Sequence, residues 1–381
     1  MKRLTFLLAA LMLCATVAAV HRPRIVYRVE PIASSPHDTG EALAINARGD
    51  VAGQLNDSAF IWHAGHVTLF SPLPFLAPGD AVAGIARTIN RSGLAGGSEG
   101  YYTPCAMTGL ALATATLFRD GKTSYVDPSP NVRQCGFEVN GMNDEGAIVG
   151  VKAYRGFVRY PNGKELEIQP LSTRPVDNGT SASAIDNEGH VVGGTTINVK
   201  KVRYLDVGIL RPRGKRAQIL RAPDPNSYFI HAFVATFVDG TQHMRDLGAL
   251  PGFPDTFATA LNEGLTIVGY SGNESGPKWT RVSGKSHAWV WQNGRMSDLG
   301  SALGESSYAY GVNDADTIVG CDGDDAVRWV DKREEDLNTL IDPHSGWHLT
   351  CARAINRVGR IVGTGTYEGH QLPFRLVPIP G

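Results

Sequence analysis

The sequence lacks sustained helical periodicity, an excess of charge of either sign and, after its first 19 residues, any apolar run long enough to cross a bilayer. Glycine (44 residues) and proline (22 residues) recur too often for long helices, so the composition predicts an all-β chain. A net charge of −1 gives no long-range field that would attract nucleic acid or a membrane in general, and we expect no nucleic-acid partner. Any partner must therefore be inferred from local features of the sequence.

Residues 1–19 have the pattern of a secretory signal peptide. Two basic residues precede an apolar run, and small residues lead to a predicted cleavage site after about Ala19. A membrane anchor is the alternative, and Cys14 raises lipidation, although Leu13 stands where a lipoprotein has a small residue. We therefore expect a soluble mature chain that is periplasmic or secreted.

Cysteine is scarce, with five residues in all, four of them after the predicted signal. An even number in an oxidising compartment favours two disulfides. In the repeat frame described below, one cysteine of each pair follows the second strand of a repeat, and the other precedes the first strand of the next, 30 residues later. We therefore predict the bridges Cys105 to Cys135 and Cys321 to Cys351. No CxxC or histidine-spaced cluster favours a metal site instead.

What the sequence has in abundance is one nine-residue phrase, which occurs seven times. It reads apolar, Asn, two variable residues, Gly in most copies, a variable residue, two apolar residues and Gly. The copies begin at Ile45, Ile89, Met142, Ile185, Leu261, Val312 and Ile355. Asp186 replaces the Asn in the fourth copy. A strand that ends in Asn, a tight turn and a second strand predict a β-hairpin, and the last Gly permits close packing or a bulge.

A second pair of strand signals follows each phrase, clearest in His231 to Gly248 and in Ser286 to Gly300. One repeat is thus four antiparallel strands. The phrases are 43 to 53 residues apart, except for one gap of 76. Four strands at this period are typical of a propeller blade. The sequence therefore predicts one domain over residues 24–381, a seven-bladed β-propeller of four-stranded antiparallel blades.

The two ends of the repeat array predict how the ring closes. The seventh repeat has a third strand at Leu372 to Val377 and no fourth, whereas Arg24 to Ile32 is an extra strand before the first phrase. We expect this N-terminal strand to pair with the last blade, because the pairing would satisfy both sheet edges. A linear solenoid, the alternative, would leave those edges open.

The gap of 76 residues holds an insertion at about residues 195–230. Two segments in it, Val202 to Leu210 and Ala217 to Ala222, predict a further hairpin. An eighth, truncated blade is the alternative interpretation. It is the weaker one, because a blade without its inner strands would leave a gap in the core.

Two local charge clusters are candidate binding sites. The inserted hairpin is strongly basic and could contact an acidic polysaccharide, lipid headgroups or an acidic protein face, although a solvated hairpin is the plainer interpretation. Its candidate binding residues are Arg211, Arg213, Lys215 and Arg216. The acidic loop near Cys321 could hold calcium, but it lacks EF-hand spacing. Its candidate ligands are Asp322, Asp324 and Asp325.

Two repeats carry a family resemblance in their second strand pairs. His231, Ala232 and Phe233 are followed by Asp246, Leu247 and Gly248, and the same pattern recurs from His287 to Trp289 and from Asp298 to Gly300. On these residues the chain resembles the bacterial extracellular repeat family named for its HAF tripeptide. The resemblance implies export and a repeat architecture, not a particular chemistry. We expect the histidines to hydrogen-bond to a neighbouring blade's turn and the aspartates to accept from turn amides.

The sequence shows no catalytic constellation. A G-x-S-x-G match at residues 96–100 lacks the following helix that a hydrolase nucleophile needs. We therefore expect a monomeric, non-enzymatic scaffold that binds a protein or glycan of the cell envelope, with no cofactor other than possible calcium. The alternative is a carbohydrate-active or other hydrolytic propeller with its site at the channel mouth. Glycosidic chemistry would require two inward carboxylates about 5 to 10 Å apart.

Overall fold

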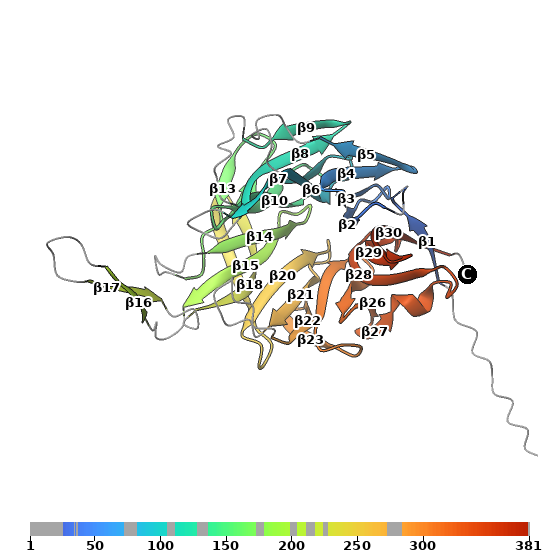
Figure 1. Cartoon of the computed structure of the whole chain (residues 1–381). Helices are drawn as coiled ribbons and strands as arrows, with labels where there is room; N and C mark the ends of the chain where they lie inside the picture. Colours follow the sequence, from blue (N-terminus) through green and yellow to red (C-terminus); the bar gives the residue numbers. More distant parts are fainter. Residues whose placement is uncertain are drawn as a thin grey trace, which may run out of the picture.

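The chain folds into a ring of seven four-stranded antiparallel sheets, the blades of a β-propeller (Figure 1). The computed structural model describes residues 26–33, 35, 37–71, 82–104, 111–127, 136–172, 179–198, 204–210, 218–223, 228–272 and 284–379. The fold class predicted from the repeats is therefore confirmed. In the described part of the chain no helix is long and apolar enough to cross a membrane.

Each blade runs from an innermost first strand to an outermost fourth strand. Blade 1 contains β2 (Gly40–Ile45), β3 (Val51–Leu55), β4 (Ser58–His63) and β5 (His66–Phe70). Blade 2 contains β6 (Val82–Ile89), β7 (Ala95–Pro104), β8 (Ala111–Arg119) and β9 (Lys122–Tyr125). Blade 3 contains β10 (Phe137–Met142), β11 (Ile148–Lys152), β12 (Arg155–Arg159) and β13 (Glu165–Glu167).

The remaining blades repeat this order. Blade 4 contains β14 (Thr180–Ile185), β15 (Val191–Asn198), β18 (Tyr228–Val238) and β19 (Thr241–Gly248). Blade 5 contains β20 (Asp255–Leu261), β21 (Ile267–Gly272), β22 (Ser286–Gln292) and β23 (Arg295–Gly300). Blade 6 contains β24 (Ser307–Val312), β25 (Ile318–Asp322), β26 (Asp325–Val330) and β27 (Arg333–Asp336), followed by a 3-10 helix, η2 (Leu337–Leu340).

Blade 7 is assembled from both ends of the described chain. Its first three strands are β28 (Trp347–Ile355), β29 (Ile361–Tyr367) and β30 (His370–Pro378), and its outermost strand is β1 (Tyr27–Pro31). β1 pairs antiparallel with β30, with Tyr27 opposite Pro378 and Pro31 opposite Phe374. The predicted closure of the ring by the N-terminal strand is confirmed, and the open solenoid is not formed.

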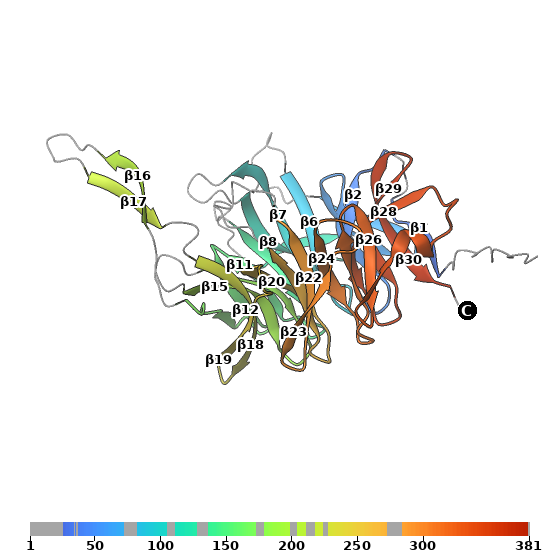
Figure 2. The same cartoon turned by 90° about the horizontal axis from the view of Figure 1, so that it is seen from below.

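The inserted segment forms a hairpin of its own within blade 4. β16 (Tyr204–Leu210) pairs with β17 (Gln218–Pro223) in a two-stranded sheet, and the chain then returns to β18, which pairs with β15. Both cartoon views show the hairpin projecting away from the ring (Figures 1 and 2). The ring therefore has seven blades, and the eight-bladed alternative is wrong.

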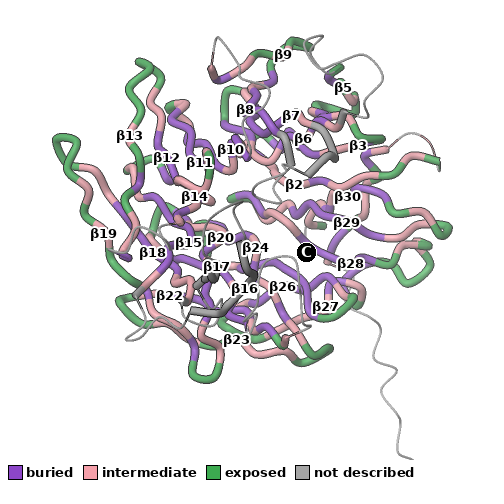
Figure 3. The backbone as a smooth tube through the Cα atoms, turned by 60° about the vertical axis from the view of Figure 1, so that its left-hand side comes forward, coloured by how far each residue is buried: buried purple, intermediate pink, exposed green. Residues whose placement is uncertain are grey.

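The core lies between the blades. Seven apolar clusters each join residues of two adjacent blades, such as Val51 and Phe60 of blade 1 with Val362 of blade 7. Buried residues follow the strands, and exposed residues gather at the turns (Figure 3). The last Gly of the phrase permits a close approach within a blade: a Cβ on Gly150 would lie 1.9 Å from the carbonyl oxygen of Glu138. A register shift follows at Val139 in the paired strand.

One predicted disulfide joins two blades. Cys321 in β25 of blade 6 bonds to Cys351 in β28 of blade 7, with their Cα atoms 4.8 Å apart. The pairing is confirmed. Both cysteines lie inside strands rather than beside them, because β25 continues to Asp322 and β28 already begins at Trp347. The other predicted bridge, Cys105 to Cys135, lies outside the described residues.

Candidate functional site

The repeated Asn organises the turn between the first and second strands of its blade. In blade 1 the Oδ1 of Asn46 accepts hydrogen bonds from the backbone amides of Arg48, Gly49 and Asp50, each at 3.0 Å. Asn recurs at this position because a short amide side chain can bond to its own turn. The six repeated Asn residues and Asp186, which takes the same position in blade 4, are only 5 to 7% exposed.

The same side chains join neighbouring blades into a ring. The Nδ2 of each Asn donates to the backbone carbonyl of the corresponding residue in the next blade. These bonds run from Asn46 to Asn90 (2.9 Å), Asn90 to Asn143 (3.4 Å), Asn143 to Asp186 (3.2 Å), Asn262 to Asn313 (2.9 Å), Asn313 to Asn356 (3.2 Å) and Asn356 to Asn46 (3.1 Å). The phrase therefore builds the hub of the propeller as well as its hairpins.

Blade 4 departs from this pattern because Asp186 has no amide to donate. Its carboxylate accepts from the backbone amide of His190 (2.7 Å) and lies 2.8 Å from the Nδ1 of that histidine. The connection to blade 5 is made one residue further on, where the Nδ2 of Asn187 donates to Glu263 at 2.6 Å. The single Asp among seven phrases thus coincides with a different link between two blades.

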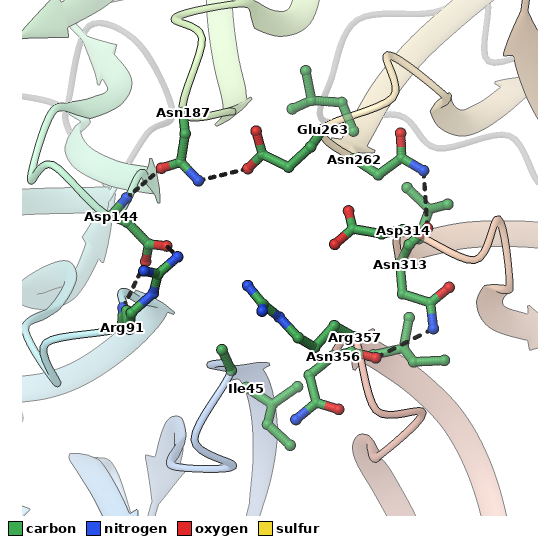
Figure 4. A pocket seen from close by; sticks show the side chains of 14 residues that line it. Ile45, Arg91, Asp144, Asn187, Asn262, Glu263, Asn313, Asp314, Asn356 and Arg357 are labelled. Atoms are coloured by element: carbon green, nitrogen blue, oxygen red, sulfur yellow. Dashed lines mark hydrogen bonds and ion pairs between the residues drawn. The ribbon is translucent and has the colours of Figure 1, made fainter.

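The residue that follows the ring Asn or Asp faces the mouth of the central channel. These positions hold Ala47, Arg91, Asp144, Asn187, Glu263, Asp314 and Arg357. Together with apolar residues below them, they line a pocket of about 420 Å³ (Figure 4). The apolar residues are Ile45, Leu261, Val312 and Ile355, which come directly before the ring position. The mouth is therefore a polar rim above an apolar floor.

Polar contacts tie one side of this rim together. Arg91 forms an ion pair with Asp144 at 2.8 Å, the backbone amide of Asp144 donates to Asn187 at 2.9 Å, and Asn187 in turn donates to Glu263. Burial raises the pKa of Glu263, and the nearby negative charges of Asp186 and Asp314 raise it further.

The other side of the rim is open to a ligand. Asp314 and Arg357 point into the space between the turns (Figure 4) and make no side-chain hydrogen bond or ion pair with the described residues. Both are exposed. A negative and a positive group are therefore available at the same mouth.

Charge is segregated around this end of the ring. The first turns, between the first and second strands, carry the basic residues Arg357, Arg360, Arg48 and Arg91 in blades 7, 1 and 2. The corresponding first turns of blades 3 to 6 hold no Lys or Arg; besides the buried Asp186, they carry the acidic residues Asp144, Glu145, Glu188, Glu263, Asp314 and Asp316. The one carboxylate in these basic first turns, Asp50, is buried. We call this end of the propeller the turn face; its first turns, around the channel mouth, form a basic sector and an acidic sector.

Further into the ring, charged residues of the innermost strands pair across blades. Arg87 of blade 2 lies 3.5 Å from Glu138 of blade 3, and Arg353 of blade 7 lies 3.7 Å from Glu41 of blade 1. The guanidinium of Arg353 also lies over the ring of Tyr310, 4.5 Å from its centre. Both of these carboxylates thus face an arginine.

Two of the three acidic residues proposed for calcium accept hydrogen bonds from protein donors through their carboxylates, whereas Asp324 contacts His348 through its backbone carbonyl. Asp322 is fully buried and accepts from Ser301 and from the backbone amides of Leu303 and Gly304. Asp325 lies at the other end of the same turn and accepts from Asn338 at 3.2 Å. Within the described ranges, no group of three or more His, Cys, Asp or Glu residues could hold a metal ion.

Other predictions fall outside the described residues. These are the signal segment 1–19 and the basic candidates Arg211, Arg213, Lys215 and Arg216, which lie in sequence between β16 and β17. The channel mouth was not predicted from the sequence, although the seven phrases contain the information. When the phrases are aligned, the first variable position, directly after the Asn or Asp, shows the charged residues that line the mouth.

The HAF and DLG motifs form one structural unit. The Nδ1 of His231 lies 2.9 Å from Asp246, and that of His287 lies 3.0 Å from Asp298. The predicted partner in a neighbouring blade is wrong, because the third and fourth strands of one blade place the two motifs opposite each other. The aspartates accept from turn amides as predicted, at Gly248 and Gly300, each at 2.7 Å.

Comparison with known proteins supports the fold alone. No model of a known protein family matches the sequence, and no curated protein is significantly similar to it. Among solved structures, a streptogramin B lyase shares 9% identity with a TM-score of 0.50, over 94% of this chain and 100% of that one. At these identities the likeness concerns architecture and carries no activity.

Two further solved structures are more distant. The extracellular domain of a protein assigned to hybrid two-component systems of B. thetaiotaomicron shares 8% identity with a TM-score of 0.48, over 93% of this chain and 40% of that one. The acylaminoacyl peptidase of Pyrococcus horikoshii shares 10% identity with a TM-score of 0.42, over 76% of this chain and 44% of that one. The chain thus spans less than half the length of either structure.

Proposed function

We propose that this protein is an exported, non-enzymatic β-propeller that binds a protein partner at its turn face, centred on the channel mouth. The observation that carries the proposal is the segregation of charge around that mouth, with arginines on blades 7, 1 and 2 and carboxylates on blades 3 to 6. Asp314 and Arg357 supply one open group of each sign.

A protein partner fits this pattern better than a charged glycan. A surface patch of a protein can carry both signs and so match the basic and acidic sectors at once, which fixes the orientation of binding and accelerates encounter. A polyanionic glycan would gain from the basic sector but would be repelled by the six carboxylates that, besides the buried Asp186, lie in the first turns of the other four blades. Electrostatic complementarity therefore favours a partner of mixed charge.

Export is part of the proposal and has support of its own. The bond between Cys321 and Cys351 is typical of proteins in oxidising compartments. The pattern of residues 1–19 predicts the same route.

The test is capture of a partner from cell-envelope extract with the mature, oxidised chain at low and high salt. The captured protein is identified by mass spectrometry, purified, and titrated against the wild type and the double variant Arg357→Glu/Asp314→Lys. We expect tight binding at low salt, and at least a tenfold loss of affinity in the variant, because charge reversal at an interface costs several kcal/mol.

A matched control reverses a pair at the opposite end of the strands. Lys285 and Glu305 are 64% and 84% exposed and lie in connections on that other face, so Lys285→Glu/Glu305→Lys should bind as the wild type does. Equal loss in both double variants, or no loss in the mouth variant, refutes binding at the turn face.

A further inference from the structure

A second pocket lies on the turn face, at the seam where β1 closes the ring. Its volume is about 420 Å³, and it is bounded by β1 and β30, by two turns of blade 1 and by the first turn of blade 7. The charged or aromatic side chains that line it are Glu30, Arg48, Asp50, Trp62, His63, Arg360 and Arg375.

The two carboxylates of this pocket are already occupied. Asp50 accepts from Asn46, Arg48 and His63 at 2.5 to 2.8 Å. Burial alone would raise the pKa of Asp50, but these hydrogen bonds outweigh it and lower the pKa. Glu30 pairs with Arg28 and Arg375, which lower its pKa against the same effect of burial. Both acids therefore stay ionised at neutral pH and hold their arginines in place.

Arg360 is the arginine of this pocket that is not paired with either carboxylate. Its guanidinium donates to the backbone carbonyl of Arg48 at 3.2 Å, and it forms no ion pair with the described residues. It is packed tightly over the blade 1 turn, since a Cβ on Gly49 would lie 2.6 Å from its Nη1. Three guanidinium groups against two carboxylates leave one excess positive charge, and His63 adds another when it is protonated.

The neighbouring groups keep the pocket in shape. Arg375 lies over the ring of Trp62, 4.2 Å from its centre, and donates to the carbonyl of Gly49 at 3.2 Å. The side chain of Arg375 is only 13% exposed. A stacked and bonded arginine loses little freedom on binding, which favours a preorganised site.

We propose that this seam pocket binds an oxyanion, a carboxylate or phosphate group, with Arg360 as its principal contact. A planar guanidinium suits both groups, because it offers parallel N–H donors to two oxygens. The bound anion would touch segments from both ends of the sequence, so its binding should stabilise the closed ring. The proposal concerns a site distinct from the channel mouth and does not depend on the protein partner proposed above.

The experiment uses the isolated mature chain and two probes, inorganic phosphate and glucuronate, each compared with sodium chloride at equal ionic strength. We expect a saturable rise in melting temperature with at least one probe and a binding isotherm by calorimetry. Arg360→Gln should weaken that binding at least tenfold. Arg295→Gln, which alters an exposed arginine at the start of β23 in blade 5, is the matched control and should bind as the wild type does.

The outcomes separate the possible sources of the anion. Phosphate binding alone indicates a phosphorylated ligand, and glucuronate binding indicates a carboxylate. Should Arg360→Gln fail to fold, Arg360→Lys keeps the charge but loses the fork of donors, and it should bind more weakly than the wild type. The proposal is overturned if neither probe acts beyond chloride, or if the variants bind as tightly as the wild type. Either result leaves the test of the turn face unaffected.

Discussion

Replacing one asparagine of the central ring should destabilise the whole propeller. Asn313 is 6% exposed; its Oδ1 accepts from the backbone amides of Ala315 (3.1 Å) and Thr317 (3.0 Å), and its Nδ2 donates to the carbonyl of Asn356. Asn313→Ala removes these three bonds and leaves buried polar groups without a partner. At about 1 kcal/mol for each bond, with a further penalty for the orphaned groups, the loss is about 2 to 4 kcal/mol.

The assay is urea unfolding followed by tryptophan fluorescence. The matched control is Asn162→Ala, since exposed Asn162 accepts one bond from the amide of Lys164 in a turn at the blade edge. That substitution should cost no more than about 0.5 kcal/mol, as for other surface changes. Equal losses for the two variants would refute the structural role of the ring.

Asn313→Asp separates the two functions of the side chain. The carboxylate keeps the acceptor for the turn but places an oxygen against the carbonyl of Asn356. This contact disfavours the charged form, so the pKa in the folded variant should exceed the unfolded value of about 3.9. Relative to the wild type, the variant should then be least destabilised near pH 4 and lose stability as the pH rises through that raised pKa. A pH-independent difference would contradict the proposed contact.

Three further predictions concern other parts of the ring. Replacing Cys321 and Cys351 by serine should lower the free energy of unfolding by about 3 to 4 kcal/mol, because the bond closes a loop of 30 residues, and an unchanged urea midpoint would contradict this. Replacing residues 199–227 by a short Gly-Ser turn should leave the melting temperature within a few degrees, because Asn198 and Tyr228 are opposite each other in the ladder; loss of folding would show that the hairpin is part of the core. Burial, and then the charge of Asp322, raise the pKa of Glu334 to about 7, so this group should stabilise the fold below pH 4.5 and lose that contribution as the pH rises through 7. Glu334→Gln should flatten the dependence of the urea midpoint on pH across this range, and an unaltered dependence would assign it to other groups.

The architecture could be predicted from the sequence because each of the seven repeats carries the same pattern of strands and turns. Seven copies of one phrase predicted seven hairpins, and the extra strand before the first phrase predicted the closure between β1 and β30. The same frame gave the pairing of Cys321 with Cys351. In each case a local pattern was enough, because the blades differ little from one another.

The candidate sites depend on contacts that no local pattern records. The seam pocket brings Glu30 beside Arg375, which is 345 residues away in the sequence. The partner of His231 was misassigned because a bulge between Ala232 and Phe233 sets the register that places Asp246 opposite. The channel mouth could be predicted from the sequence in part. Its residues are adjacent to the repeated Asn, but their common location follows only once the ring is closed.

The closed ring is the claim on which the turn face and the seam pocket both depend, and a cross-link tests it directly. Arg28 lies opposite Val377 in the pairing of β1 with β30. In the variant Arg28→Cys/Val377→Cys, oxidation should join these two positions, because opposed residues of paired strands have Cβ atoms about 5 Å apart. Arg28→Cys/Lys122→Cys, with its second cysteine in blade 2, should not form such a bond. Peptide mapping that finds no bond between residues 28 and 377, in a chain that retains the bond from Cys321 to Cys351, would contradict the closed propeller.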